Sequence, residues 1–143
     1  MTRPTRSRER GRTAATADAA TSPRRALVVE SESATADLIS AELQVLGFVT
    51  ETVSAAVEAV IAARRATPSL IVLALQLHDA YGPQLLVWLR ANPELKTVPV
   101  LAIQAASDDA ARLGQEGFAA VLKKPLSAER IREAVSAVIP VTV

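Results

Sequence analysis

Cysteine is absent from this 143-residue chain, histidine occurs once, and only four residues are aromatic. The lack of cysteine excludes a disulfide, a thiol nucleophile and a thiolate metal site. A single His78 excludes the zinc and iron centres that need several histidines. No apolar run approaches the roughly 20 residues of a membrane-spanning helix, so we expect a soluble, cytoplasmic protein with no membrane contact. With few aromatic residues, the core must be built from Val, Leu, Ile and Ala.

The net charge of +1 hides an asymmetry between the two parts of the chain. Residues 1–25 carry seven arginines against Glu9 and Asp18, a net of +5, whereas residues 26–143 carry nine basic and thirteen acidic side chains, a net of −4. The first 24 residues contain almost no large apolar side chain, so we expect them to form a disordered tail before a domain over residues 25–140. Three interpretations of the tail stay open: a solvated segment, an arm that contacts nucleic acid or acidic surfaces, and a cleaved transit segment.

From Ala26 onward, short apolar segments alternate five times with segments of helical periodicity. We expect strands over residues 26–29, 48–53, 70–75, 98–103 and 118–122. We expect five helices. Three of them are capped by Ser33, Ser54 and Ser127, one spans residues 83–91, and one starts at Ser107. Gly47 suits the left-handed position after the first helix. Continuously apolar strands are buried on both faces, which predicts an α/β fold with a doubly wound, five-stranded parallel sheet.

In such a sheet the functional crevice lies beyond the carboxyl ends of the strands, where the strand order reverses. The fold therefore nominates the residues at or just past the strand ends, which are Glu30, Ser31, Ala74, Gln76, Gln104 and Lys124.

Four segments together resemble the receiver domain of response regulators, of the chemotaxis-regulator type, over about residues 25–140. These segments are Val28-Val29-Glu30-Ser31, Leu73-Ala74-Leu75-Gln76-Leu77, Ile103-Gln104-Ala105 and Leu122-Lys123-Lys124-Pro125. The resemblance implies the flavodoxin-like (βα)5 fold. It also implies that Ala74 occupies the position of the phosphate-accepting aspartate, and a methyl group cannot accept a phosphoryl group.

The same resemblance implies a magnesium site made of two acids after the first strand and the phosphoacceptor. Here Glu30 keeps one carboxylate, Ser31 replaces the second, and Ala74 removes the third. Because Mg²⁺ needs hard oxygen ligands in octahedral geometry, we expect weak or no Mg²⁺ binding and no other cofactor.

The switch residues of the family are replaced as well. Its hydroxyl residue corresponds to Gln104 and its aromatic residue to Val121, whereas Lys124 and Pro125 keep the closing Lys-Pro, which implies a cis peptide bond. Departures at several positions favour a naturally degenerate pocket over a single engineered change. We expect Lys124 to pair with Glu30, Gln104 to reach toward Ser31 or Lys124, and the pocket to hold one fixed conformation.

Three further features have competing interpretations. Val87 and Trp88 form a candidate partner patch on the third helix, or the indole simply covers the flank of that helix. Asp79 is a polar loop residue or, as a minor alternative, a substitute phosphate acceptor. Mixed charges on the last two helices are a solvated surface or the site of a weak homodimer; they belong to Asp108, Asp109, Arg112, Glu129, Arg130, Arg132 and Glu133.

The sequence therefore predicts a non-enzymatic, stand-alone receiver-like adaptor in two-component signalling. It would act by contact with a histidine kinase or another regulator, independently of aspartyl phosphorylation. The alternatives are a conventional phosphorelay receiver with a substitute acceptor, and a nucleic-acid-associated protein that works through its arginine tail.

Overall fold

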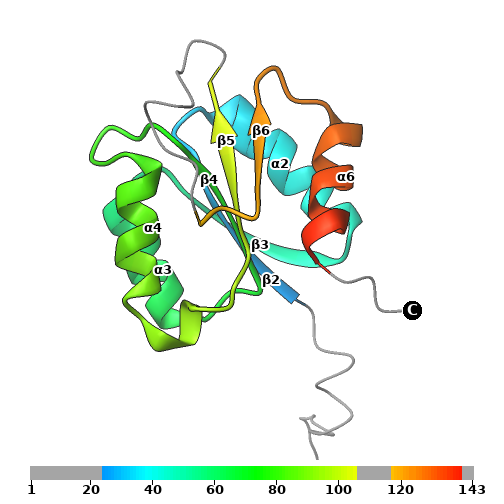
Figure 1. The fold of residues 1–143 in the computed structure, drawn as a ribbon. Coiled ribbons are helices and arrows are strands. Elements are labelled where there is room, and N and C mark those ends of the chain that lie inside the picture. Colours follow the sequence, from blue (N-terminus) through cyan, green and yellow to red (C-terminus); the bar gives the residue numbers. More distant parts are fainter. Residues whose placement is uncertain (1–23, 106–116, 140–143) are drawn as a thin grey trace, which may run out of the picture.

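The computed structural model describes residues 24–105 and 117–139, which form a parallel sheet with helices on both faces (Figure 1). The strands are β2 (Arg24–Val29), β3 (Phe48–Val53), β4 (Leu70–Ala74), β5 (Val100–Gln104) and β6 (Ala120–Lys123). The helices are α2 (Ser33–Val45), α3 (Ala56–Arg65), α4 (Gly82–Arg90), the short 3₁₀ helix η1 (Pro93–Leu95) and α6 (Ala128–Val138).

The five strands lie in the order β3-β2-β4-β5-β6, and every neighbouring pair is parallel. This is the doubly wound α/β sheet that the alternating pattern predicts, with β2 and β4 neighbours at the point where the strand order reverses. The expected helix that starts at Ser107 lies outside the described residues.

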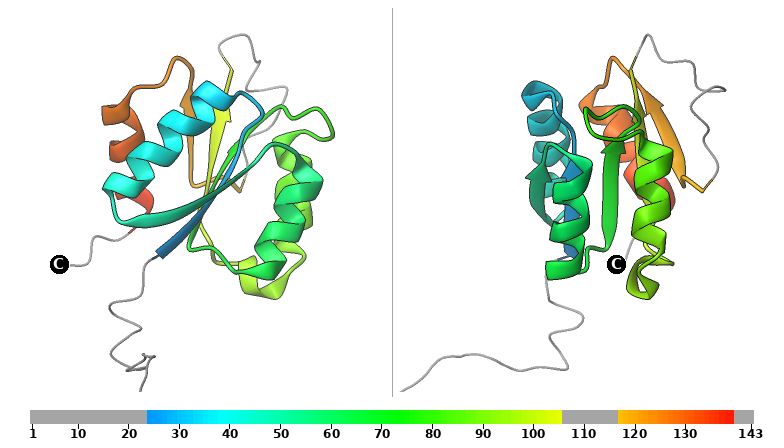
Figure 2. Two further views of the ribbon diagram at one scale, coloured as in Figure 1. Left: turned by 180° about the vertical axis from the view of Figure 1, so that it is seen from behind. Right: turned by 90° about the vertical axis from the view of Figure 1, so that its left-hand side faces the viewer.

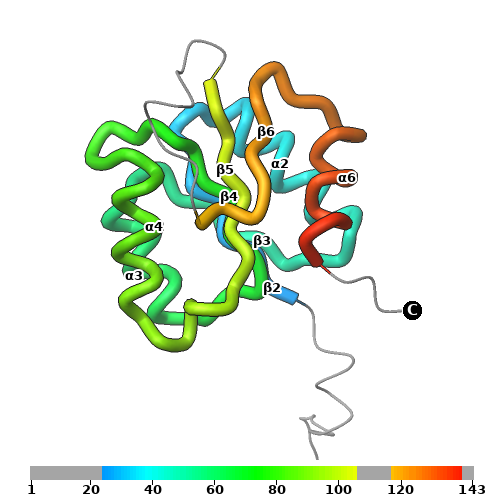
Figure 3. The backbone as a smooth tube through the Cα atoms, in the orientation of Figure 1, coloured from blue at the N-terminus to red at the C-terminus, as the bar shows by residue number. Residues whose placement is uncertain are grey.

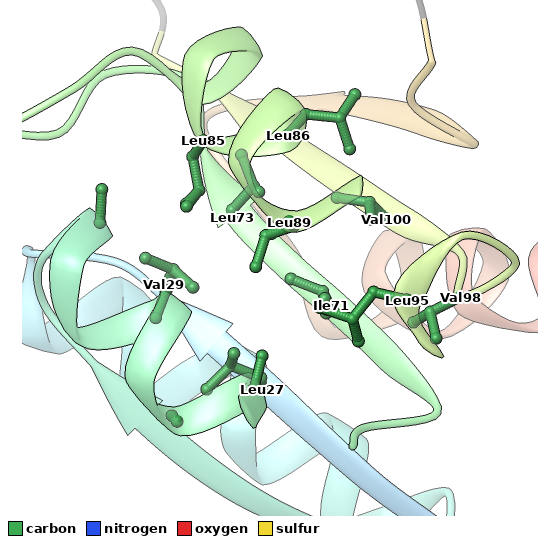
Figure 4. Packing of buried hydrophobic residues seen from close by; sticks show 14 of the residues in the cluster. Leu27, Val29, Ile71, Leu73, Leu85, Leu86, Leu89, Leu95, Val98 and Val100 are labelled. Atoms are coloured by element: carbon green, nitrogen blue, oxygen red, sulfur yellow. The ribbon is translucent and has the colours of Figure 1, made fainter. Parts of the chain in front are cut away.

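Two apolar layers hold the helices against the sheet. Cluster one lies under α3 and α4 and includes Leu27, Ile71 and Leu73 from the strands with Leu85 and Leu89 from α4 (Figure 4). Cluster two lies under α2 and α6 on the opposite face and is built mainly from Val, Ile and Leu. Figure 2 shows α3 and α4 side by side on one face of the sheet. Because aromatic residues are nearly absent, the core is built mainly from aliphatic side chains, as the composition predicts.

The domain begins one residue earlier than expected. Strand β2 begins at Arg24, which pairs in register with Phe48 and places its guanidinium 5.8 Å from the centre of that ring, so residue 24 belongs to the domain rather than to the tail. Gly47 has φ +95° as expected.

The predicted caps of the first two helices are wrong. The residue at the cap position of α2 is Glu32, and that of α3 is Ala55; neither makes a side-chain capping bond. Only Ser127 caps as predicted, since its hydroxyl accepts a hydrogen bond from the Arg130 N–H.

Candidate functional site

The carboxyl ends of the adjacent strands β2, β4, β5 and β6 lie at one edge of the sheet, where the chain turns into its loops (Figure 3). The residues nominated from the sequence lie at or just after these strand ends. Val29 lies beside Leu73 in the register of β2 and β4, so Glu30 and Ala74 follow at the same level. The Lys124 N–H donates a 2.8 Å hydrogen bond to the Gln104 carbonyl. Glu30, Ala74, Gln104 and Lys124 therefore lie at one edge of the sheet.

Lys124 forms ion pairs with two carboxylates that follow β2. Its Nζ lies 3.6 Å from Glu30 Oε1 and donates a hydrogen bond of 3.1 Å to Glu32 Oε1. The Glu30 side chain is only 4 % exposed and that of Lys124 is 25 % exposed. The expected pairing of Lys124 with Glu30 is confirmed, and so is the cis Lys124–Pro125 peptide bond.

The buried carboxylate of Glu30 is held on one side by the backbone. Its Oε2 accepts a 3.0 Å hydrogen bond from the Glu32 N–H, whereas its Oε1 has no hydrogen-bond partner among the described residues. A buried carboxylate without a counterion is costly, so the nearby Lys124 ammonium is the main compensation for the charge on Oε1.

Glu32 is a site residue that the sequence analysis missed. Its carboxylate accepts hydrogen bonds from the Thr35 hydroxyl and from Lys124, and these contacts lower the pKa of Glu32. The signal in the sequence was the acidic spacing Glu30-Ser31-Glu32 directly after an apolar strand.

Ala74 is buried, and α4 begins very close to it. Gly82 donates its N–H to the Leu75 carbonyl at 2.7 Å, and a Cβ on Gly82 would lie 3.1 Å from the Ala74 carbonyl oxygen and 2.9 Å from Leu73 Cδ1. Glycine is therefore required for this close approach. Gln76 is exposed and forms an isolated antiparallel bridge with Tyr81 across the loop.

Asp79, in the loop between β4 and α4, caps α3 from a distance in sequence. Its Oδ1 accepts a 2.9 Å hydrogen bond from the Ala56 N–H, and its Oδ2 accepts one of 3.1 Å from the Val57 N–H. These two bonds lower the pKa of Asp79. Asp79 therefore caps α3 in place of Ser54, the cap predicted from the sequence. Ser54 instead donates its N–H and hydroxyl to Glu58.

The remaining residues nominated from the sequence around this site differ in their exposure. Ser31 is exposed, Gln104 is buried and Val121 is half-buried. The side-chain reach of Gln104 toward Ser31 or Lys124 stays a prediction.

The proposed partner patch faces outward as expected. Val87 is exposed, and Trp88 is 40 % exposed beside a hollow of about 450 Å³ that Val60 and Arg64 of α3 also line. A partner at this patch stays a prediction.

Both arginines of α6 are bonded within the molecule. Arg130 donates to the carbonyls of Lys123 and Pro125, and Arg132 donates a 2.6 Å hydrogen bond to Glu42 on α2. Asp108, Asp109 and Arg112 lie outside the described residues, so the homodimer through the last two helices stays a prediction.

The described residues offer neither a clustered metal site nor a membrane-spanning helix. Within residues 24–105 and 117–139, no group of three or more His, Asp and Glu side chains is arranged to hold a metal ion. No helix in that part of the chain has both the length and the apolar character to span a bilayer.

Comparison with known proteins places this site in a family. The response regulator receiver domain matches residues 26–136. The polar-differentiation response regulator DivK of Brucella anthropi is 30% identical over 115 residues, which cover 79% of this chain and 94% of that protein.

Solved structures share the fold. The CheY-like receiver domain of Methylobacillus flagellatus is similar with a TM-score of 0.73 and 27% identity, over 82% of this chain and 100% of that one. The receiver domain of the sensor histidine kinase PA1611 of Pseudomonas aeruginosa PAO1 has a magnesium ion in its active-site cleft. It resembles this chain in fold, with a TM-score of 0.73 and 24% identity over 82% of this chain and 98% of that one.

Proposed function

The chain belongs to the response regulator receiver domain family of two-component signalling, and we propose that it works there without accepting a phosphoryl group. The observation that carries the proposal is that β4 ends in Ala74 while Lys124 forms ion pairs with two carboxylates. A methyl group ends β4 where a carboxylate would be the acceptor, and the nearby ammonium is already paired with Glu30 and Glu32.

The residues of this edge do not fit a magnesium ion. Glu30 Oε1 faces the Lys124 ammonium at 3.6 Å, Oε2 is bonded to the Glu32 N–H, and Ala74 offers no oxygen from its side chain. Mg²⁺ keeps near-ideal octahedral geometry and takes carboxylates together with waters and phosphate oxygens. A cation at this point would have to displace Lys124, so we propose that the site works with no Mg²⁺ and that the domain is not an enzyme.

In this proposal, the ion pairs of Lys124 hold the loops at the strand ends in one fixed arrangement, where a metal-dependent switch would let them move. Lys124 joins the loop after β6 to the two carboxylates after β2, and Asp79 fixes the loop after β4 to the start of α3. These contacts need no ligand. The domain would then present one constant surface to a protein partner, such as a histidine kinase or another regulator, with Val87 and Trp88 as the candidate contact.

The substitute-acceptor alternative rests on Asp79 in the loop after β4. Both oxygens of Asp79 accept backbone hydrogen bonds from α3, and phosphorylation would remove that cap. This geometry favours a structural role for Asp79 over that of an acceptor.

The proposal can be tested with amide NMR spectra of the full chain recorded before and after addition of Mg²⁺ and beryllofluoride, a mimic of the phosphoryl group. We expect no shifts at Glu30, Ala74 or Lys124 beyond those caused by ionic strength. Saturable shifts clustered at these residues would contradict the proposal.

A further inference from the structure

Helix α3 exposes two of its three larger apolar side chains, Val57 and Ile61, whereas Val60 packs against cluster one. The residues that it buries against the sheet are all alanines, namely Ala56, Ala59, Ala62 and Ala63. Val57 and Ile61, one turn apart, are 57 % and 56 % exposed. A surface helix normally buries its larger apolar residues and exposes polar ones, and a helix that is apolar on both faces is normally covered on both.

The outer face of α3 also has opposite charges at its two ends. Glu58 lies three positions before Ile61, and Arg64 and Arg65 lie three and four positions after it. Acidic residues suit the first turn of a helix and basic residues suit the last, but here they also lie on either side of the exposed Ile61. From Glu58 to Arg64, the outer face is acidic, then apolar at Ile61, then basic.

This order of charges is complementary to itself. When a second α3 packs antiparallel about a twofold axis near Ile61, each Glu58 lies opposite the basic end of the other helix. Ile61 then meets Ile61 of the other copy, and Val57 lies beside the alkyl stem of Arg65 of that copy, which is the self-complementary contact of a symmetric dimer. We propose that α3 forms the interface of a homodimer of this chain, packed antiparallel about Ile61.

The intramolecular contacts leave a cation available for this pairing. Arg65 is bonded to Glu51, and Glu58 accepts from Ser54. Arg64 is exposed and has no hydrogen bond or ion pair within the described residues. Arg64 also lines the hollow beside Trp88. A neighbouring helix would therefore cover Val60 and the Trp88 indole together with Val57 and Ile61.

The α3 face is better suited to self-association than α6, whose Arg130 and Arg132 are bonded within the molecule. The pairing also does not depend on phosphorylation, so it holds or fails independently of the function proposed above.

Sedimentation equilibrium of the full chain over a range of concentrations tests the interface. We expect a monomer–dimer equilibrium for the wild type and dissociation constants about tenfold higher for Glu58→Lys and for Arg64→Glu, each of which places like charges opposite one another. Lys96→Glu, the same charge change on an exposed residue beyond η1, should leave the dissociation constant unchanged. Circular dichroism checks that each variant is folded.

Mixing gives the decisive result. Lys at position 58 of one variant would lie opposite Glu at position 64 of the other, so an equimolar mixture of Glu58→Lys and Arg64→Glu should form a heterodimer while each alone is weakened. A monomeric wild type, a mixture that stays monomeric, or a dimer that is lost in Glu133→Lys on α6 and kept in the α3 variants would overturn the proposal.

Discussion

The ammonium of Lys124 lies 3.6 Å from Oε1 of Glu30, at the carboxyl end of two strands that are far apart in sequence. Glu30 is almost fully buried and Oε1 has no hydrogen-bond partner in the described part of the chain. Lys124 therefore compensates a charge that is expensive to bury, and the loop after β6 is fixed to the edge of β2 by electrostatics rather than by a ligand.

Lys124→Met should lower the free energy of unfolding by about 2 kcal/mol, because it leaves the Glu30 carboxylate buried without a cation. The loss is smaller than for a fully buried pair, since Lys124 is partly exposed. The double variant Glu30→Gln/Lys124→Met should recover most of this loss, because the amide carries no charge. Urea unfolding measures both, with Lys123→Met as a matched control at an exposed lysine. Equal losses in the single and double variants would contradict a direct interaction.

Asp79→Asn should destabilise the domain by about 1 kcal/mol at neutral pH, because the charged cap of α3 is lost. The pKa of Asp79 is lowered by the hydrogen bonds from the Ala56 and Val57 N–H groups, so its contribution is complete above the usual value of 3.8 and is lost as the pH falls below that value. Unfolding measured between neutral pH and pH values below the usual pKa should therefore show less acid sensitivity in Asp79→Asn than in the wild type. Asp37→Asn, which makes the same change at an exposed acid on α2, is the control.

Trp88→Ala should cost much less stability than Leu89→Ala, although the two residues are adjacent on α4. Leu89 is fully buried in cluster one, and its truncation should cost about 3 kcal/mol, whereas the indole is 40 % exposed at the edge of a hollow. Thermal unfolding separates the two variants. If Trp88 is a contact residue, Trp88→Ala should remain folded and lose partner capture, while a folded variant with unchanged capture would exclude the patch.

Restoring acids should restore cation binding. In Ser31→Asp/Ala74→Asp, three carboxylates would gather at the edge of the sheet with Glu30, which supplies the hard oxygen ligands that Mg²⁺ requires. Calorimetric titration should detect Mg²⁺ binding in this variant and none in the wild type. The single variant Ala74→Asp should bind more weakly than the double variant, since it lacks the second of the two acids after β2.

The sequence was sufficient to predict the fold because its signals are local. Apolar runs separated by helical periodicity specified five strands, and their common direction placed Glu30, Ala74, Gln104 and Lys124 at one edge. That edge follows from topology alone, so it needs no knowledge of side-chain positions.

Contacts between distant segments were not predictable in the same way. Ser54 was the natural local cap of α3, yet the N–H groups of Ala56 and Val57 bond to Asp79, more than twenty residues later. The pairing of Lys124 with Glu30 was predicted, but its second ion pair, with Glu32, depends on how two loops meet, and no spacing along the chain encodes that meeting.

Intact mass spectrometry after incubation with a small phosphodonor and Mg²⁺ tests the central claim most directly. The wild type and Ser31→Asp/Ala74→Asp are treated side by side, with Asp79→Asn as a third sample. We predict that the wild type keeps its mass and that the double variant gains one phosphoryl group, which shows that the conditions support transfer. A phosphoryl adduct on the wild type, whether or not Asp79→Asn removes it, would contradict the account.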